Sequence, residues 1–285
     1  MPFTLDSLMS DIRSKVNTED TTTEVSKSEL DELKANTIVV MPAGGKGLRI
    51  RNETQNEDIN KVMISVDGKE SMIERTVREY ATCGIDNFVV LTGFLAKSVE
   101  QHLGDGSRWG VDIRYSEDPN GRKVGSAGAI LNAVNNGTLI DGMTAIIHNP
   151  DDMIIGMKRP YCEVFLEGQI RAKRRGCIAT FIVVPETPYQ YSGMIVDKGI
   201  VRDIRKYPPI AVPAHTGITV LGPEIYDYFR RLVSLEVESS FENVVAPEVA
   251  KAGKLYAINI PSECWVPIND LKGIETARAA LGLHA

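Results

Sequence analysis

Apolar strand-like runs alternate with helical patterns along most of this chain, and the alternation restricts it to one class of fold. The first strand-like runs lie at 37–42, 62–66 and 87–92, and helical patterns lie at 71–83 and 95–103. Parallel strands need crossover helices between them, so this order predicts an α/β fold. We expect a Rossmann-like, mostly parallel sheet flanked by helices.

The helix at 71–83 has both of its ends defined by the sequence. Ser71 and Glu74 stand in capping-box register, and Gly84 follows the last turn. The pattern then predicts strands at 111–115, 144–148, 177–184, 215–221 and 254–260, with helices at 127–136, 241–252 and 270–282 and one opened by Pro223. A hairpin through Asp197-Lys198-Gly199 suggests that the sheet is mixed in its second half.

A glycine-dense loop follows the first strand and carries two cations. Gly44, Gly45 and Gly47 stand within four positions, with Lys46 among them and Arg49 two residues further on. Glycines lack the Cβ atoms that keep backbone N–H groups away from an anion, and the cations add charge at the same place. The loop therefore predicts a phosphate site of the kind that binds a nucleotide. The alternative is a tight turn with no ligand.

Spacing excludes two common phosphate loops. A Walker loop ends in Gly-Lys-Ser/Thr, whereas here Lys46 precedes Gly47 and Leu48 follows it. The dinucleotide fingerprint, counted from Gly45, would need its third glycine at Ile50. The nucleotide site is therefore of another kind.

A pair of carboxylates follows the apolar strand at 144–148. Ligands in open α/β sheets collect beyond the carboxyl ends of strands, so Asp151 and Asp152 are expected to face the same crevice as the glycine loop. Carboxylate oxygens suit Mg²⁺. The alternative for this pair is an ordinary helix N-cap.

Composition narrows the class and the compartment. The 285 residues carry a formal charge of −6, which argues against a general nucleic-acid binder. The four cysteines form no Cys-x-x-Cys pair and are expected to be buried reduced thiols, and the histidines show no metal-ligand spacing. Without a signal-like start or an eighteen-residue apolar run, we expect a cytoplasmic enzyme with no membrane partner.

Residues 1–36 are polar and lie before the first strand. A weak amphipathic pattern at Phe3, Leu5, Leu8 and Ile12 is compatible with a helical arm used in assembly, and equally with a partly ordered tail. The question of a homo-oligomer stays open at this point.

Several short segments between residues 37 and 280 resemble, in their order and spacing, the sugar-1-phosphate nucleotidylyltransferases. The glycine loop from Ala43 to Arg49 is similar to the family's Ala-Gly-Gly-x-Gly-Thr-Arg signature. The other matching segments are Lys61 before Val62-Met63-Ile64, Gly125-Ser126-Ala127-Gly128-Ala129, Asp151, Gly217-Ile218 with Pro223-Glu224, and Phe241-Glu242 with the Trp265 region. The resemblance implies a GT-A-like, three-layer α/β/α domain over 37–285, with 1–36 as an extension.

The resemblance also implies a reaction and a set of roles. A sugar 1-phosphate oxygen attacks the α-phosphorus of a nucleoside triphosphate, and pyrophosphate leaves, with Mg²⁺ as cofactor. The implied catalytic residues are Arg49, Lys61 and Asp151. The implied nucleotide-binding residues are Ala43, Gly44, Gly45, Gly47, Glu117, Gly125, Ser126 and Gly128, and the implied acceptor-binding residues are Gly193, Lys206 and Gly217.

The chain departs from the family pattern at three informative places. Asn60 replaces the proline before the lysine, and Pro267 stands where the family has its second metal-ligating aspartate. Asp270 is the expected replacement ligand beside Asp151, with Asn269 and Asp152 as alternatives. A further alternative is a metal held by Asp151, phosphates and water alone. Arg205-Lys206-Tyr207-Pro208 lacks the acidic residue of the family's Glu-Lys-Pro stretch, and a cationic replacement favours a more anionic acceptor.

These departures leave three hypotheses open. The first is an active Mg²⁺-dependent nucleotidylyltransferase acting on a sugar 1-phosphate. The second, motivated by Pro267, is a nucleotide-binding regulatory or structural subunit that lost turnover. The third is a nucleotidylyltransferase for a phosphate other than a sugar phosphate.

Overall fold

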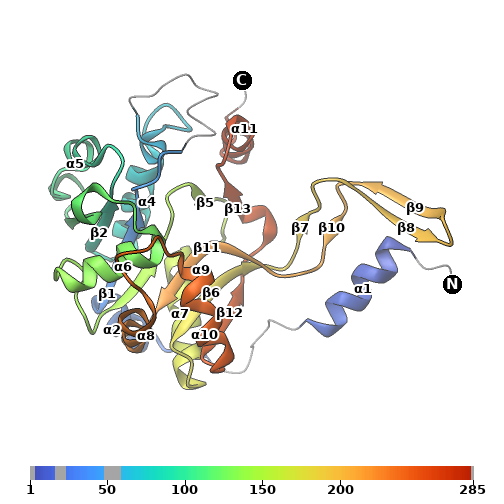
Figure 1. Cartoon of the computed structure of the whole chain (residues 1–285). Coiled ribbons are helices and arrows are strands. Elements are labelled where there is room, and N and C mark those ends of the chain that lie inside the picture. The colour runs from blue at the N-terminus through green and yellow to red at the C-terminus, as the bar shows by residue number, and fades with distance from the viewer. Residues whose placement is uncertain (1–3, 17–23, 48–58, 284–285) are drawn as a thin grey trace.

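The computed structural model of the chain describes residues 4–16, 24–47 and 59–283, and a seven-stranded sheet forms its centre (Figure 1). The strands stand in the order β12-β6-β11-β4-β1-β2-β3, and only β11 runs antiparallel to its neighbours. They are β1 (Thr37–Pro42), β2 (Asn87–Thr92), β3 (Asp112–Glu117), β4 (Thr144–Ile147), β6 (Ala179–Val184), β11 (Ala214–Leu221) and β12 (Leu255–Asn259). The predicted mixed, mostly parallel sheet is confirmed.

Helices cover both faces of this sheet. They are α2 (Lys27–Ala35), α4 (Met72–Thr82), α5 (Ala96–Leu103), α6 (Gly125–Asn135), α7 (Tyr161–Arg174), α8 (Tyr226–Leu232), α9 (Phe241–Val244) and α10 (Ala246–Lys251). Helix α11 (Leu271–Ala280) packs instead in a third, smaller cluster with Met153 and Val266. The capping box at Ser71 is present, and Gly84 takes a positive φ of 84° after α4. Both predicted ends of this helix are therefore confirmed.

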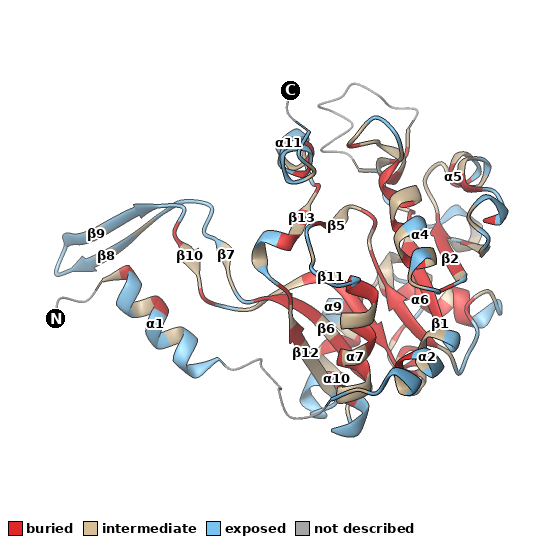
Figure 2. Ribbon diagram, turned by 180° about the vertical axis from the view of Figure 1, so that it is seen from behind, coloured by how far each residue is buried: buried red, intermediate tan, exposed pale blue. Residues whose placement is uncertain are grey.

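The two cores follow from the two-residue period of the strands. On β1, Val39 and Met41 point into one cluster with α4, α5 and α7, while Ile38 and Val40 point into a second cluster with α6, α8 and α10. All four side chains are fully buried. Figure 2 shows the buried strands as the red centre of the molecule.

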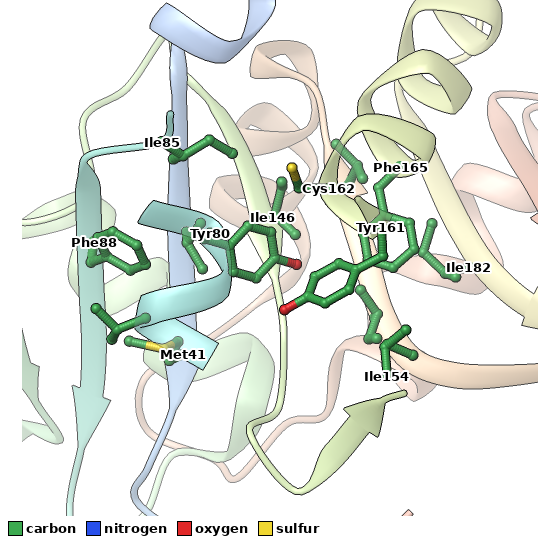
Figure 3. Packing of buried hydrophobic residues seen from close by; sticks show 14 of the residues in the cluster. Met41, Tyr80, Ile85, Phe88, Ile146, Ile154, Tyr161, Cys162, Phe165 and Ile182 are labelled. Carbon is green, nitrogen blue, oxygen red and sulfur yellow. The ribbon is translucent and has the colours of Figure 1, made fainter. Parts of the chain in front are cut away.

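Aromatic side chains of α4 and α7 meet over the first of these faces. Tyr80 packs edge-on against Tyr161, whose ring also contacts Phe165. Figure 3 shows the rings of Tyr80 and Tyr161 coming from opposite sides and pointing toward one another. Burial raises the pKa of both phenols. The cluster fixes α7 on the sheet and, through Tyr80, reaches the strand that carries the predicted carboxylates.

Two sequence predictions are wrong. Residues 62–66 do not form a strand: a 3-10 turn, η1 (Lys61–Met63), occupies the start of that range, and the Asn60 side chain caps it. The cysteines are not all reduced, since Cys83 at the end of α4 and Cys162 at the start of α7 form a disulfide. These cysteines are 79 positions apart, and only helix packing brings them together.

The N-terminal segment contains two helices with different surroundings. Helix α2 packs on α7, where Leu30 joins the core and Lys34 pairs with Glu163 at 2.7 Å. Helix α1 (Leu5–Lys15) instead lies along a β-ribbon that projects from the body (Figure 1). The two parts of the expected extension therefore contact different regions of the protein.

The ribbon is the segment 185–213 between β6 and β11, which we call the arm. It contains β7 (Thr187–Pro188), β8 (Ser192–Asp197), β9 (Ile200–Lys206) and β10 (Pro209–Ile210). Its tip is a two-residue turn in which Lys198 and Gly199 both have positive φ, as the predicted hairpin requires. A further small sheet pairs β5 (Asp152–Ile154) with β13 (Trp265–Pro267).

No helix in the described part of the chain is long and apolar enough to cross a bilayer.

Candidate active site

A cleft of about 670 Å³ opens where the parallel strands β1, β2 and β3 end. This is the edge of an α/β sheet at which ligands ordinarily bind. The lining residues are Gly44, Gly45, Lys46, Gly47, Lys61, Gly93, Phe94, Asp118, Gly121, Lys123 and Asn269. Three lysines and one carboxylate give the cleft an excess of positive charge, as a phosphate ligand requires.

The glycines of the loop permit close approach of the backbone. An ideal Cβ on Gly44 would lie 3.4 Å from the Gly93 nitrogen, so the loop rests against the end of β2. Gly47 has a φ of 56°, and a Cβ there would lie 2.8 Å from the Lys61 Cβ. A side chain at Gly47 would collide with Lys61 and would be strained at this φ, so this glycine helps to set the shape of the cleft. Ala43 is buried, and its N–H donates to the Leu91 carbonyl.

Asn60 joins the loop to the lysine that follows it. Its buried side-chain amide donates to the carbonyl of Ala43 at 2.7 Å and to that of Phe94 at 2.9 Å. Its oxygen accepts from the Val62 N–H at 3.2 Å and so caps η1. Sequence reasoning treated Asn60 only as a missing proline. The structure shows that this residue positions Lys61.

Lys61, which lines the cleft, forms an ion pair with Asp151. The Lys61 ammonium lies 2.5 Å from the Asp151 carboxylate, and both side chains are largely shielded from water. Asp151 follows β4, and its carbonyl accepts from the Ile268 N–H. Two residues far apart in sequence are thus neighbours, as their predicted shared role requires. The structure also brings Gly44, Gly45 and Gly47 to the cleft that Lys61 lines.

Asp152 is half-buried and directly follows Asp151. It accepts hydrogen bonds from the Asn149 amide and the Trp265 indole, each at 3.1 Å. A Cβ on Gly217 would lie 2.4 Å from its carboxylate, so the glycine at this bulge of β11 makes room for Asp152. Burial and the neighbouring charge of Asp151 raise the pKa of Asp152 to about 7. Two adjacent carboxylates in this state favour a cation between or beside them.

His148 holds the backbone of this segment. Its Nε2 donates to the Asp152 carbonyl at 2.9 Å, so its Nδ1 accepts from the Tyr80 hydroxyl at 2.9 Å. Complete burial lowers the pKa of His148 to about 4. The imidazole therefore stays neutral near pH 7 and acts as a fixed link between α4 and the Asp151-Asp152 turn.

The donor set at this turn fits magnesium in its usual protein environment. The described residues contain no group of three or more His, Cys, Asp or Glu side chains placed to hold a metal. Mg²⁺, however, is commonly held by one or two carboxylates together with substrate phosphates and water. Asp151 and Asp152 supply the carboxylates, and Asn269 lines the same cleft.

The structure distinguishes the candidates for the second metal ligand by where each side chain lies. Pro267 pairs with Asp152 in the β13–β5 register, so the 265–269 segment does run beside the carboxylates. Asp270 caps α11 by accepting from the Gly273 N–H at 2.8 Å. Its side chain is thus engaged in a helix cap, whereas Asn269 lines the cleft and Asp152 directly follows Asp151.

The second glycine motif packs against protein rather than lining the cleft. Gly125 has a φ of 77°, and a Cβ there would lie 2.4 Å from the Ser239 carbonyl oxygen. Ser126 accepts from the Phe241 N–H, and Gly128 packs on Val124. The close approach that these residues permit is therefore an approach of the 239–241 segment to the start of α6.

Asp118, which the sequence analysis did not single out, lines the cleft at the end of β3. The preceding residue, Glu117, is exposed, and its carbonyl accepts from Asn132. Burial raises the pKa of Asp118 to about 6, and a Cβ on Gly93 would lie 3.0 Å from its carboxylate. The sequence feature that could have identified Asp118 as a site residue is its position directly after β3, a strand that ends at the cleft.

Two other predicted residues, Gly193 and Lys206, lie away from the cleft. Gly193 and Lys206 belong to the arm, where Gly193 packs near Pro208 and Lys206 stands over the Tyr207 ring at 4.9 Å. The arm projects away from the cleft (Figures 1 and 2), so one copy of the chain does not bring them to the glycine loop. Arg49 lies outside the described residues.

Comparison with known proteins identifies the family of this chain. A model of the nucleotidyl transferase family matches residues 38–280. The chain therefore belongs to the nucleotidyl transferase family. Sequence similarity extends to the UTP–glucose-1-phosphate uridylyltransferase of Synechocystis sp., with 28% identity over 245 residues, 79% of this chain and 58% of that protein. The glucose-1-phosphate adenylyltransferase of Fusobacterium nucleatum is 34% identical over 79 residues, 28% of this chain and 20% of that protein. The chain thus spans little more than half of the longest-matching of these relatives.

Solved structures agree on the fold. A Bacillus anthracis protein assigned as a glucose-1-phosphate thymidylyltransferase, in complex with sucrose, superposes with a TM-score of 0.65 at 20% identity, over 87% of this chain and 96% of that one. A UDP-glucose pyrophosphorylase complexed with UDP-glucose gives a TM-score of 0.60 at 16% identity, over 87% of this chain and 99% of that one. The predicted family and fold class are confirmed.

Proposed function

We propose that this chain transfers a nucleoside monophosphate from a nucleoside triphosphate to a sugar 1-phosphate, releasing pyrophosphate. The observation that carries the proposal is the Lys61–Asp151 contact at the cleft beside the glycine loop. It sets an anion holder and a cation holder side by side, which attack on an α-phosphorus needs. The sugar phosphate oxygen forms a bond to the α-phosphorus, and the bond to the bridging oxygen of pyrophosphate breaks.

Each residue contributes charge or position rather than covalent chemistry. The N–H groups of Gly44 to Gly47 face the departing phosphates, and Lys46 neutralises them. Lys61 stabilises the charge on the α-phosphate and the incoming phosphate. When Mg²⁺ is bound, Asp151 and Asp152 hold it, and the ion offsets the charge that develops on the phosphate oxygens.

Neutral His148 and the Asn60 amide keep these groups in place. His148 is hydrogen-bonded on both ring nitrogens, and Asn60 makes three hydrogen bonds. Preorganised groups of this kind need no rearrangement during the reaction, which is the main source of rate in phosphoryl transfer.

The nucleoside end of the cleft is assigned to Asp118. A carboxylate repels phosphates, so the triphosphate lies toward Lys46 and Lys61, and the base or ribose lies toward Asp118. An anionic oxygen accepts hydrogen bonds from ribose hydroxyls and from exocyclic amino groups. Asp118 is therefore the residue whose change to Asn should alter nucleotide preference.

The decisive experiment measures pyrophosphate release with four nucleoside triphosphates against a panel of sugar and non-sugar phosphates. Release with one pair, lost in Lys61→Met while that variant remains folded, supports the proposal. Release only with a non-sugar phosphate would move the acceptor to the other class. Nucleotide binding without release for any pair would replace the proposal by the nucleotide-binding subunit that Pro267 favours.

A further inference from the structure

The Cys83–Cys162 disulfide joins two helices at the points where their tyrosines meet. Cys83 is the C-cap of α4, and Cys162 is the second residue of α7. Tyr80 lies three residues before Cys83, and Tyr161 directly precedes Cys162. Figure 3 shows Cys162, Tyr80 and Tyr161 within one packed cluster. The disulfide therefore limits how far the two tyrosine rings can move apart.

Contacts lead from these tyrosines to the turn that carries the two carboxylates. The Tyr80 hydroxyl donates to His148 Nδ1, and His148 Nε2 donates to the Asp152 carbonyl, each at 2.9 Å. The Tyr161 ring packs edge-on against the Tyr80 ring, with centroids 5.3 Å apart, and against the His148 ring at 5.8 Å. All three aromatic side chains are buried. Because packed interiors transmit displacement, a shift of α4 against α7 reaches the Asp151-Asp152 turn.

A reductant can reach the disulfide from the surface. Both cysteines line a cavity of about 410 Å³ between α4, the start of α7 and residues 156–160. Cys83 is half-buried and Cys162 is only 1% exposed, so Cys83 is the sulfur that is open to attack. The cavity shares no lining residue with the cleft beside the glycine loop. A molecule that acts on the disulfide therefore does not compete with the nucleotide.

The surroundings of the disulfide favour its reduction. Attack on the Cys83 sulfur releases Cys162 as a thiolate, and Cys162 lies in the first turn of the fourteen-residue helix α7. Helix N-termini and nearby cations stabilise thiolates, and a stabilised thiolate is the better leaving group. The cavity is lined by four cations and one carboxylate, which are Arg75, Arg78, Lys158, Arg159 and Glu79.

We propose that the Cys83–Cys162 disulfide is a redox switch, in which the oxidised chain is the more active form. The proposal rests on the proposed function, which places the metal and the phosphates at the Asp151-Asp152 turn. A dithiol supplies the electrons. One of its thiolates attacks the Cys83 sulfur, the S–S bond breaks, and Cys162 leaves as a thiolate. The second thiolate of the dithiol attacks its partner sulfur in the mixed disulfide and releases Cys83. The dithiol becomes a disulfide, and the two cysteines take up its two protons.

Reduction changes the position of groups and leaves the fold in place. Val77 of α4 and Phe165 of α7 are fully buried in the same core, so both helices stay on the sheet without the covalent bond. The ends of the helices at Cys83 and Cys162 gain freedom, however, and the Tyr80–His148 bond loosens with them. The carboxylates then lose the fixed position that transfer at an α-phosphorus requires.

Hydrogen exchange over residues 149–154 tests the switch without relying on turnover. The Asp152 N–H donates to the Asn149 carbonyl at 2.8 Å, so its exchange reports on the turn itself. The full chain is equilibrated with reduced or oxidised dithiothreitol, and alkylation with mass spectrometry gives the reduced fraction of Cys83 and Cys162. Reduction is expected to speed this exchange and to slow pyrophosphate release, each by about 10-fold, and reoxidation to reverse both.

Four variants separate the disulfide from other causes. Cys83→Ser/Cys162→Ser should match the reduced chain and not respond to dithiothreitol, whereas Cys177→Ser, which removes a free thiol, should keep the full response. Tyr80→Phe removes only the hydroxyl on His148, so it should speed exchange over 149–154 with the disulfide intact. Tyr226→Phe is its matched control, because this buried hydroxyl bonds the Met143 carbonyl in the other core. It should leave that exchange unchanged.

The switch is overturned if Cys83 and Cys162 stay fully alkylatable after treatment with oxidised dithiothreitol. It is also overturned if the reduced and oxidised chains exchange alike over 149–154, or release pyrophosphate equally fast. Reduction that speeds exchange while Tyr80→Phe does not would refute the route through His148. Exchange that responds as expected while neither form releases pyrophosphate would reject the proposed function and retain the redox control of the turn.

Discussion

Replacement of Asn60 by alanine tests the link between the glycine loop and Lys61. The side chain is 1% exposed and makes three hydrogen bonds, two as donor and one as acceptor. The alanine variant leaves the carbonyls of Ala43 and Phe94 without these donors. At about 1 kcal/mol for each net hydrogen bond, the loss of stability is about 3 kcal/mol. For a chain of this size that corresponds to a fall in Tm of about 6 °C or more.

The same change should also reduce catalysis. Without the amide, the loop and η1 can move independently, so Lys61 is displaced from the phosphates. We expect kcat/KM for pyrophosphate release to fall by about 10²-fold, as for other lost positioning contacts. Urea unfolding gives the free energy of unfolding, and steady-state kinetics on the same preparation gives kcat/KM.

Asn132→Ala is the matched control. Asn132 also donates two hydrogen bonds, to the Ser116 hydroxyl and the Glu117 carbonyl, but it lies on α6 away from Lys61. This variant should lose stability while keeping kcat/KM. The reasoning is refuted if Asn60→Ala unfolds at the same urea concentration as the unaltered chain, or if it is destabilised but retains full kcat/KM.

Three further changes test the rest of the site. Gly217→Ala places a Cβ 2.4 Å from the Asp152 carboxylate at a positive φ, so it should lower the free energy of unfolding in urea by more than 2 kcal/mol. The control Gly156→Ala has a similar φ but lies in open space, so it should cost about 1 kcal/mol. Equal losses in the two variants would contradict the steric account. Lys61→Met should lower kcat by about 10²–10³-fold in a pyrophosphate assay with little change in fold, and unchanged kcat would remove Lys61 from the mechanism. Burial raises the pKa of Asp118 from 3.8 to about 6, so stability is lost as pH rises between these two values, and the full cost is present above the higher one. Asp118→Asn should therefore stabilise the protein by about 1 kcal/mol at pH 8, after allowance for solvent screening, and not at pH 4; stabilisation that is equal at both pH values would contradict this.

Local sequence determined most of the secondary structure. The strands at 37–42 and 87–92 and the helix after Ser71 occur where their patterns predicted them, because the two-residue period and the capping box act over a few neighbouring residues. The 62–66 segment failed for the opposite reason. Its apolar residues looked like a strand, but one polar side chain, Asn60, reaches the distant carbonyl of Phe94 and fixes a turn there.

The glycine loop, Lys61 and Asp151 were also readable from sequence, since each follows or precedes an element whose end position is itself predictable. What the sequence did not show is the set of contacts around them. His148 is an ordinary strand-end residue until the fold buries it between Tyr80 and the Asp152 carbonyl. The Cys83–Cys162 disulfide depends likewise on how α4 and α7 pack.

The sequence by itself determined the order of strands and helices and the presence of a glycine loop and of a carboxylate pair after neighbouring strands of the sheet. Both follow from short-range chemistry, in which hydrophobic period, capping and glycine conformations are set by neighbouring residues. Only the tertiary structure decided which groups share the cleft, that Asp118 lines it while Glu117 faces away, and that Gly193 and Lys206 stand on the arm. Those outcomes depend on contacts between residues as far apart as Leu5 and Asp203, which bond across 198 positions. Burial, pKa shifts and exposed surfaces arise from such long-range packing, and the period of one segment carries no information about it.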